Sequence, residues 1–381
     1  MLLISPMEGV DPPNGDVTYT QQLLAHPPDN VEYTAYTDAL LRGEMSELYR
    51  RGGRRGRLWF AEPRFWREAI INRARSRGWL FGENFRHFRI KPGIFDAVHV
   101  HVFSVALGRN APPMVISNSI SIDALYRDGF GRPAKLVAVM AGVDRVVARM
   151  TGVSHSAFRP HRAARLVCFS DHLAAWYVNS VGVDAANIAV VPPGVTVDSI
   201  TPAFGRPFTI GFIGDWYAKG GDVVLAAHRR VRESVPDARL IVVGSSPPGA
   251  STPVVDGVSW LPRQSREDLL QVVIPRFSAF AYPSRFDGLP LTLLEVMAVG
   301  VPVVVSGYGA LPEIVQHGRS GRVTQVDDPF GLAQALLSLA QGEEAKVLGA
   351  AGRQRVAEHY ETTKNADLLG QVYAQVTQSD P

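Results

Sequence analysis

Short apolar runs alternate with segments of helical period along almost the whole chain, and the alternation begins twice. This pattern predicts an α/β fold in which crossover helices join parallel strands. A stretch rich in proline and glycine, Thr201–Pro207, separates the two series and is typical of a linker. We therefore expect two doubly wound domains, residues 1–200 and residues 201–381, with the last helix able to pack back on the N-terminal domain.

The predicted elements of the first domain follow from the apolar runs and the helical periods between them. Its strands are expected at Leu2–Ser5, Val31–Ala35, Ala97–Phe103, Met114–Ser117, Leu166–Ser170 and Ile188–Val191. Its helices are expected near Val17–Ala25, within Ala39–Arg77, near Lys135–Met150 and at Asp171–Val181.

The second domain repeats the alternation more regularly. Its strands are expected at Phe208–Gly214, Ala238–Gly244, Gly257–Leu261, Ser278–Tyr282 and Pro302–Val305. Its helices are expected at Gly221–Val235, Arg266–Val273, Pro290–Val299, Leu311–Gln316, Pro329–Gln341, Glu343–His359 and Thr362–Val376.

Composition places the chain among soluble globular proteins, with 46% hydrophobic and 20% charged residues. No run approaches about 18 uninterrupted apolar residues, so no transmembrane helix is expected. The first residues lack the basic segment of a signal peptide. The single cysteine, Cys168, lies in an apolar run, which predicts a buried structural thiol in a reducing cytoplasm and disfavours a cysteine nucleophile or a zinc site.

The segment Tyr282–Ala298 combines a strand end, an acidic turn and a helix start. Pro290 suits the first turn of a helix, and the amides of a helix N-terminus favour an anion such as phosphate. Asp287 and Glu295 flank this start, and carboxylates accept hydrogen bonds from sugar or ribose hydroxyls. The alternative is that Asp287 only caps the helix and Glu295 is a solvated helix residue.

The acid-x₇-Glu spacing of Asp287 and Glu295, within PSRFDGLPLTLLEVMAVGVPVV, resembles the signature of the GT-B retaining glycosyltransferases of family 4. The resemblance continues in SGYGALPEIV at Ser306–Val315, in Phe212–Gly214 with the Lys219-Gly220 pair, and in Pro236–Gly244. It spans about residues 166–341. It implies a GT-B architecture, two Rossmann-like domains that face each other across a cleft.

The resemblance also implies residue roles. Glu295 would bind the ribose of the nucleotide, Asp287 the donor sugar, and Lys219 the diphosphate. Backbone amides of the Gly307–Leu311 turn and of the helix start at Leu291 would contact phosphates or sugar. The predicted catalytic residues are Asp287, Lys219 and His101. The predicted donor-binding residues are Glu295, Gly15, Gly214, Lys219, Arg263, Gly288, Leu289, Leu291, Thr292, Gly309, Ala310 and Leu311.

Two of these predictions concern the N-terminal domain. Gly15 follows the first strand, where a glycine would let the backbone approach the donor phosphates; an ordinary turn glycine is the equal alternative. The stretch Val98–His101 resembles the strand of the family that ends in histidine, with a core histidine as the alternative.

Two positions depart from the family pattern. Asp215 stands where family members usually carry an arginine, so Arg263 or Arg322 would have to supply that cation. Asn118-Ser119 stand where the histidine on the acceptor side is expected. Three histidines remain as candidates for that role: His101, His155 and His161.

The resemblance thus implies a cytoplasmic hexosyltransferase-type enzyme that uses a UDP or GDP sugar, retains configuration, and needs neither metal nor cofactor. No Asp-x-Asp triplet of the kind that holds a metal–diphosphate complex occurs. The alternatives are a GT-B sugar-nucleotide epimerase and a degenerate nucleotide-binding subunit. An NAD-dependent dehydrogenase is disfavoured because Gly307–Pro312 lacks the third glycine of its motif.

The formal charge of +3 is unevenly distributed. Arg42–Lys91 holds thirteen Arg and one Lys against five Glu, a balance of +9 that leaves −6 for the rest of the chain. Eight Trp and Phe residues lie in the same segment. Together with the charge, they favour peripheral contact with an anionic membrane. The expected acceptor is a glycan, a lipid-linked molecule or a small molecule. A solvated arginine face over core aromatics is the alternative. No nucleic-acid motif accompanies the charge.

Overall fold

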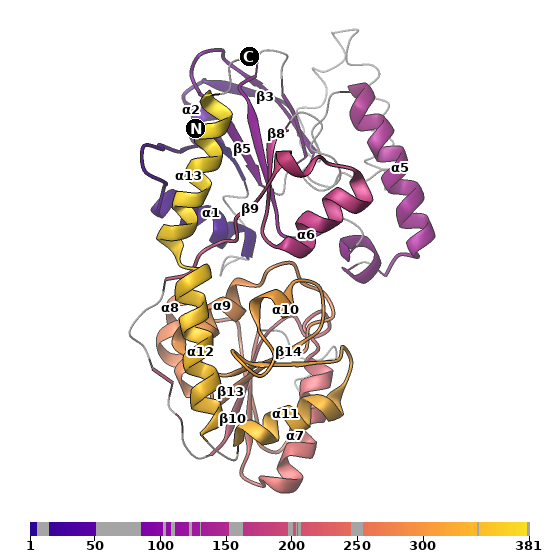
Figure 1. Cartoon of the computed structure of the whole chain (residues 1–381), viewed down its shortest axis with the longest axis vertical. Coiled ribbons are helices and arrows are strands. Elements are labelled where there is room, and N and C mark those ends of the chain that lie inside the picture. Colours follow the sequence, from indigo (N-terminus) through magenta and orange to yellow (C-terminus); the bar gives the residue numbers. More distant parts are fainter. Residues whose placement is uncertain are drawn as a thin grey trace. The chain divides into compact units, whose positions relative to one another are not determined.

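The computed structural model describes residues 1–5, 15–50, 85–101, 104–107, 111–121, 124–129, 131–151, 163–196, 201–202, 204, 207–244, 254–340 and 343–378. The chain divides into two compact units (Figure 1). The N-terminal unit comprises Met1–Val191 and Ala366–Pro381, and the C-terminal unit comprises Pro192–Asn365. The C-terminal unit therefore begins at Pro192, whereas the sequence suggested a boundary after residue 200.

The N-terminal unit is built on a six-stranded parallel sheet of order β2-β1-β5-β7-β8-β9. Its strands are β1 (Leu2–Ile4), β2 (Thr34–Ala35), β5 (Val98–His101), β7 (Met114–Asn118), β8 (Ala163–Cys168) and β9 (Ile188–Val190). The strand order reverses at β1, which pairs with β2 on one side and with β5 on the other. Each of these strands overlaps a strand predicted from an apolar run.

Helices and a buried core surround this sheet. The helices include α1 (Gly15–Ala25), α2 (Tyr36–Leu41), α5 (Ala134–Thr151), α6 (Asp171–Trp176), which a π-helical turn extends over Tyr177–Val181, and α13 (Thr362–Gln378). The core is formed by apolar side chains from the sheet, including Leu2, Ile4 and Val98, and by Tyr177. Cys168 belongs to it, and burial raises the pKa of its thiol to about 12, as expected for a structural cysteine.

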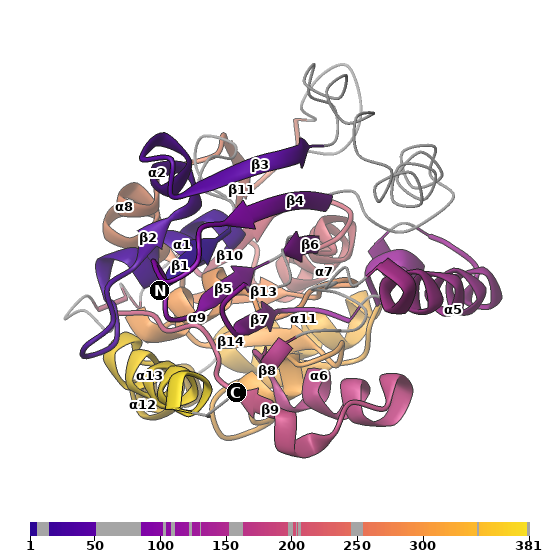
Figure 2. The same ribbon diagram turned by 90° about the horizontal axis from the view of Figure 1, so that it is seen from above.

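A second, three-stranded sheet in this unit was not predicted. β3 (Met45–Arg50) pairs antiparallel with β4 (Phe85–Ile90), which pairs parallel with β6 (Ser104–Leu107) (Figure 2). The predicted helix within Ala39–Arg77 is therefore wrong over Met45–Arg50. Phe88 and Ile90 are buried while Arg89 is exposed, which is the two-residue period of a strand. Residues 51–84, the rest of that prediction, lie outside the described residues.

The C-terminal unit is built on a six-stranded sheet of order β12-β11-β10-β13-β14-β15, and all its pairs are parallel. Its strands are β10 (Thr209–Gly214), β11 (Arg239–Gly244), β12 (Val258–Leu261), β13 (Ala279–Tyr282), β14 (Val303–Ser306) and β15 (Arg322–Thr324). From β10 the chain first adds β11 and β12 on one side of the sheet, and then adds β13, β14 and β15 on the other side. This gives the doubly wound order with its switch point between β10 and β13, where such folds bind ligands.

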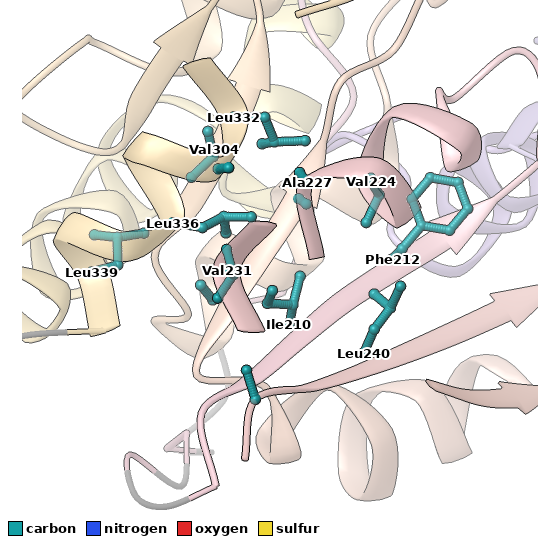
Figure 3. Close-up of a cluster of buried hydrophobic side chains, with 14 of the residues drawn as sticks. Ile210, Phe212, Val224, Ala227, Val231, Leu240, Val304, Leu332, Leu336 and Leu339 are labelled. Atoms are coloured by element: carbon teal, nitrogen blue, oxygen red, sulfur yellow. The ribbon is translucent and has the colours of Figure 1, made fainter. Parts of the chain in front are cut away.

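Helices cover the sheet of the C-terminal unit. They are α7 (Gly221–Ser234), α8 (Arg266–Asp268), α9 (Leu291–Val299), α10 (Leu311–Ile314), α11 (Pro329–Ala340) and α12 (Glu344–His359). α7 packs against α11, and α9 against α12. Figure 3 shows the apolar cluster in which Val224 and Val231 of α7 and Leu336 of α11 meet Ile210 and Phe212 of β10. This core fixes the strand ends that carry the candidate site.

The predicted class, two Rossmann-like parallel sheets with helices, is confirmed. β15 escaped prediction because it has only three residues and no apolar run. None of the helices in the described part of the chain is long and apolar enough to span a membrane.

Candidate active site

Gly214 ends β10 and lets Lys219 lie close to the strand end. Its φ of +134° is a backbone conformation that residues with a side chain rarely adopt. A Cβ at this position would lie 2.8 Å from Cγ of Lys219. The backbone conformation therefore favours glycine at this position, whereas the role of Gly214 in donor binding stays a prediction.

Asp215, which replaces the usual arginine, shapes the turn that carries Lys219. Its Oδ1 accepts a hydrogen bond from the amide of Ala218 at 2.8 Å, and its carbonyl oxygen accepts one from the amide of Lys219 at 3.0 Å. A short acidic side chain is well suited to this local contact. The carboxylate thus has a structural role in the loop after β10.

The end of β10 meets the end of β13 through Lys219. Nζ of Lys219 donates to the carbonyl oxygen of Phe286 at 3.0 Å and forms an ion pair with Oδ2 of Asp287. The hydroxyl of Tyr282, the last residue of β13, donates to the same carboxylate oxygen. The amide of Gly288 donates to Oδ1 of Asp287 at 2.9 Å. The structure therefore brings Lys219 and Asp287 together at the switch point, as two predicted catalytic residues would require.

Tyr282 is a partner that sequence reasoning missed. Burial raises the pKa of its phenol well above 10, and the neighbouring charge of Asp287 raises it further. The hydroxyl therefore remains protonated and acts as a donor that orients Asp287. The signal in the sequence was its place at the end of the predicted strand, next to the Pro283-Ser284 pair that resembles the family.

The start of α9 lies directly after this cluster. Pro290 precedes the helix in an extended conformation, and no side chain caps the first turn. Asp287 therefore does not cap α9, and that alternative is wrong. Leu289 and Leu291 are buried and Thr292 is half-buried, so this turn can offer a ligand backbone amides rather than charged side chains.

The turn after β14 approaches the same place. Gly309 has a φ of +54°, and a Cβ there would lie 3.5 Å from the carbonyl oxygen of Asp287. Ala310 and Leu311 are buried, and they anchor the turn in the core. Their contribution to a ligand site would come from the backbone, as predicted for the Gly307–Leu311 turn.

Glu295 lies in the second turn of α9 and forms a separate pair with Arg266 of α8. Nε of Arg266 donates to Oε1 of Glu295 at 2.7 Å, and the glutamate side chain is only 7% exposed. Burial raises the pKa of Glu295, whereas the charge and hydrogen bond of Arg266 act in the opposite direction. The alternative of a solvated helix residue is therefore wrong. Sequence reasoning missed Arg266.

The two arginines named as substitutes for the missing cation differ in surroundings. Arg263 follows β12 and is exposed. Arg322 begins β15 and pairs with Glu344 at the start of α12, so it is engaged in a structural contact. A third arginine, Arg285, binds Asp222 through both terminal nitrogens, at 2.7 and 2.8 Å, and so ties the loop after β13 to the start of α7.

In the N-terminal unit, the switch point between β1 and β5 places His101 beside the start of α1. Nε2 of His101 lies 3.4 Å from Oδ1 of Asp16, which is long for a hydrogen bond, and the histidine is fully buried. Burial would raise the pKa of Asp16, but its interaction with His101 prevails and lowers it. Gly15 begins α1, and a Cβ there would meet nothing within 4 Å.

The other residues considered for the acceptor side have less structural support than His101. His155 and His161 lie outside the described residues. Asn118, at the position of the expected histidine, is buried, and its Nδ2 donates to the hydroxyl of Tyr177 at 2.9 Å. Within the described ranges, no group of three or more His, Cys, Asp or Glu side chains could hold a metal ion; metal independence itself stays a prediction.

The fold and this arrangement define a GT-B protein of two Rossmann-like domains. Solved structures support the fold. Over the full chain, sucrose-phosphate synthase from Thermosynechococcus elongatus superposes with a TM-score of 0.65 at 17% identity, with 99% of that chain covered. HepE from Anabaena, crystallised with UDP and glucose, superposes with a TM-score of 0.55 at 12% identity over 81% of this chain and 80% of its own.

Residues 207–342 match the family described as glycosyl transferases group 1, which agrees with the resemblance found in the sequence. The family 4 subtype stays a prediction. D-inositol 3-phosphate glycosyltransferases of Mycobacterium bovis and Mycobacterium tuberculosis are 29% identical to this chain over 73% of its length. The chain spans 62% of the length of these curated relatives.

Proposed function

We propose that this chain transfers a sugar from a nucleoside-diphosphate sugar to an acceptor hydroxyl. The observation that carries the proposal is the pairing of Lys219 with Asp287 at the switch point between β10 and β13, beside the uncapped start of α9. Open α/β sheets bind ligands at such points, and a cation next to free helix amides suits a diphosphate. The names of the relatives, and the UDP and glucose in the HepE structure, support a nucleotide-sugar donor.

In this proposal, Lys219 exchanges Asp287 for the diphosphate when the donor binds. The lysine then stabilises the charge that develops on the departing nucleoside diphosphate, together with the amides of α9. Asp287, still held by Tyr282 and Gly288, accepts hydrogen bonds from hydroxyls of the donor sugar. Glu295 accepts hydrogen bonds from the ribose, and Arg266, which pairs with it, opposes the rise in its pKa that burial causes.

The chemistry on the acceptor side is proposed from fewer contacts. His101 is the group of the N-terminal unit that would contact a substrate hydroxyl, because its Nε2 is buried and has no hydrogen-bond partner among the described residues. We further propose that transfer retains configuration and requires neither metal nor cofactor. The acceptor is a glycan, a lipid-linked glycan or a small molecule, and Arg42–Lys91 provides peripheral contact with the inner face of a membrane.

A two-stage experiment tests the proposal. The first stage is a thermal-shift screen of the whole chain against UDP, GDP, ADP and their sugars, because ligand at about 100 times its Kd adds roughly 2.7 kcal/mol to stability. The second stage measures release of the nucleoside diphosphate and formation of the glycoside, with and without EDTA, and determines the anomeric configuration by NMR.

Each outcome has a distinct meaning. Glycoside formation that persists in EDTA supports a metal-independent transferase. Isomerisation or hydrolysis of the donor without an acceptor would identify the epimerase instead. Nucleotide binding without consumption of any sugar donor would identify a degenerate subunit, and stabilisation by NADH alone would point to a dehydrogenase.

A further inference from the structure

Arg285 joins three segments at the carboxyl edge of the C-terminal sheet. It lies in the loop that follows β13. Its guanidinium contacts Tyr217 in the loop after β10, Asp222 in the first turn of α7, and Asp327 in the loop after β15. Two of these partners bracket Lys219 in the sequence, because Tyr217 precedes the lysine and Asp222 follows it. The contacts of Arg285 therefore surround the residue that is proposed to bind the diphosphate.

The planar fork of the guanidinium makes these contacts at the same time. Nη1 donates to the carbonyl oxygen of Tyr217 at 3.0 Å and to Oδ1 of Asp222 at 2.7 Å, and Nη2 donates to Oδ2 of Asp222 at 2.8 Å. Nε donates to Oδ1 of Asp327. Cζ of Arg285 also lies 5.0 Å from the centroid of the Tyr217 ring. One side chain thus donates four hydrogen bonds, which the ammonium of a lysine, with three donors, cannot do.

The backbone beside this arginine holds the same loop. The amide of Arg285 donates to the carbonyl oxygen of Ala218 at 2.9 Å, and Oγ of Ser284 donates to that oxygen at 3.2 Å. Tyr217 and Ala218, the two residues before Lys219, therefore both have their carbonyl oxygens bound by the loop after β13. These contacts fix the backbone from which the side chain of the lysine extends.

The side chain of Lys219 depends on this support when a donor binds. In the structure its Nζ is held by the carbonyl oxygen of Phe286, at 3.0 Å, and by the carboxylate of Asp287. In the proposed function the lysine exchanges Asp287 for the diphosphate, so one of these two contacts is lost. A lysine side chain is long and flexible, and a backbone that stays in place limits the positions that Nζ can occupy. Electrostatic catalysis relies on groups that are held in place before the charge develops.

The ion pairs of Arg285 are better suited to positioning than to stabilisation. The side chains of Asp222 and Asp327 are 53% and 57% exposed, whereas that of Arg285 is 18% exposed. Ion pairs with exposed partners contribute little to the stability of a fold. The hydrogen bond from Arg285 lowers the pKa of Asp222, so this carboxylate is ionised at neutral pH. We therefore expect the loss of Arg285 to loosen the loops without unfolding the C-terminal unit.

We propose that Arg285 is a positioning residue that holds the loop after β10 so that Nζ of Lys219 meets the diphosphate of the donor. The inference rests on the proposed function, in which Lys219 binds that diphosphate. Arg285 acts through the lysine and not on the substrate, since its donors are directed at the three segments that it joins.

The test uses three variants of these contacts. Arg285→Met keeps the length of the side chain and removes every donor. Arg285→Lys keeps the positive charge but has no planar fork. Asp222→Asn weakens the same contact from the side of α7, and it provides a second version of the test if Arg285→Met does not fold. Circular dichroism and the thermal midpoint show whether each variant is folded.

Arg232→Met is the matched control. Arg232 lies near the other end of α7. It donates to the carbonyl oxygens of Pro236, at 3.0 Å, and of Asp256, at 2.8 Å, and it pairs with the carboxylate of Asp256 at 2.7 Å. This variant therefore removes an arginine with the same kinds of contact from the same unit, away from the candidate site.

The first readout is independent of activity. In the loop after β10, the amide of Lys219 donates to the carbonyl oxygen of Asp215 at 3.0 Å. Hydrogen exchange of the full chain, followed by mass spectrometry, measures how often such hydrogen bonds open. Exchange in peptides that cover residues 215–222 should be about fivefold faster in Arg285→Met, because hydrogen bonds of this kind each contribute modestly. Arg232→Met should leave this exchange unchanged.

The second readout separates a role through Lys219 from a general loss of structure. Arg285→Met should lower kcat by about tenfold, less than the loss of about 10²–10³ expected when the lysine itself is removed. In the Lys219→Ala background the same substitution should have almost no further effect, because two residues that act through one group are not additive. Arg285→Lys should resemble Arg285→Met, and Arg232→Met should keep the kcat of its background.

Three results would overturn the inference. The first is unchanged hydrogen exchange over residues 215–222 in a folded Arg285→Met. The second is a loss of kcat in the double variant equal to the product of the losses in Lys219→Ala and Arg285→Met. The third is wild-type kcat in Arg285→Lys, because a positive charge without the fork would then be sufficient.

The inference and the proposed function can fail separately. If the wild type binds no nucleoside diphosphate and transfers no sugar, but exchange rises in Arg285→Met and not in Arg232→Met, Arg285 holds the loop and the proposed function fails. If the wild type transfers sugar and a folded Arg285→Met keeps both its exchange and its kcat, the proposed function stands and the positioning role fails.

Discussion

Nε of Arg266 donates a hydrogen bond to Oε1 of Glu295 at 2.7 Å, so the carboxylate expected to bind ribose is already paired in this structure. The two partners are unequally placed, because the glutamate side chain is 7% exposed and that of Arg266 is 39% exposed. An arginine that remains accessible can reorient when a ligand arrives, whereas the buried carboxylate stays in place. The pair therefore suits a binding site in which the carboxylate of Glu295 is a fixed hydrogen-bond acceptor and the guanidinium of Arg266 is a counter-charge that can move.

Replacing Glu295 with Gln should weaken nucleotide binding. A ribose hydroxyl would lose a charged acceptor, and such hydrogen bonds contribute about 1.5–3 kcal/mol, roughly a tenfold to hundredfold change in Kd. Isothermal titration with the nucleotide selected by the thermal-shift screen measures the effect. Glu344→Gln is a matched control, because Glu344 pairs with Arg322 outside the candidate site. Equal Kd values for both variants and the wild type would remove Glu295 from the site.

The stability of the C-terminal unit should depend on pH through Glu295. Burial raises its pKa above the ordinary 4.5, so below that value the carboxyl is protonated in both the folded and the unfolded chain. As the pH rises through the raised pKa, ionisation favours the unfolded state, and the contribution of Glu295 to stability decreases. The difference in thermal midpoint, wild type minus Glu295→Gln, should therefore decrease as the pH rises from 4.5 to the raised pKa. A difference that stays constant from pH 4 to 8 would contradict the raised pKa.

Lys219→Ala should lower turnover by about 10²–10³, the usual cost of removing one preorganised electrostatic group. The variant should fold, because the lysine side chain is 20% exposed and its partner Asp287 retains Tyr282 and Gly288. Lys346→Ala, which removes an exposed lysine from α12, is the control and should keep full activity. Sugar transfer by Lys219→Ala at the wild-type rate would mean that another group holds the diphosphate.

Tyr282→Phe and Asp287→Asn should affect turnover more than binding of the free nucleotide. Both alter the carboxylate that is proposed to contact the donor sugar, which the free nucleotide lacks. Loss of the Tyr282 hydrogen bond leaves Asp287 less well oriented, and we expect about a tenfold lower kcat, equivalent to roughly 1.4 kcal/mol. A comparison of Kd for the nucleoside diphosphate with kcat for the sugar donor separates the two effects. A larger loss in Kd than in kcat would place Asp287 at the nucleotide instead.

The sequence predicted the C-terminal sheet well because its strands are short apolar runs, such as Ala279–Tyr282, between helices of clear period. It failed for β3 and β4. Only Phe88–Ile90 of this strand alternates in polarity, because Arg86 and His87 are adjacent polar residues, and the surrounding segment is so rich in arginine that the composition obscures the two-residue period. The strand β15 has too few residues to carry a pattern.

For the candidate site, motif spacing identified the residues but not their partners. Asp287, Glu295 and Lys219 were named from the resemblance, and each has a specific contact in the structure. The partners Tyr282 and Arg266 were missed because a pairing across loops depends on strand register, which local sequence does not encode. The contact of His99 with Tyr373 is an extreme case, since it depends on where the last helix packs.

The last prediction is that the chain binds anionic membranes through Arg42–Lys91, most of which lies outside the described residues. Basic residues near an anionic leaflet contribute roughly 1 kcal/mol each, so the +9 balance of this segment should produce binding that salt weakens. The measurement is co-sedimentation with anionic and neutral vesicles at low and high salt.

One variant replaces four arginines of the segment with Ser: Arg50, Arg51, Arg54 and Arg55. The control replaces four exposed arginines elsewhere: Arg132, Arg229, Arg239 and Arg319. Because both variants lose the same charge, weaker binding by the first alone would locate the contact in the segment. Equal binding by both variants would indicate a non-specific charge effect, and no sedimentation of the wild type at low salt would favour an acceptor in solution.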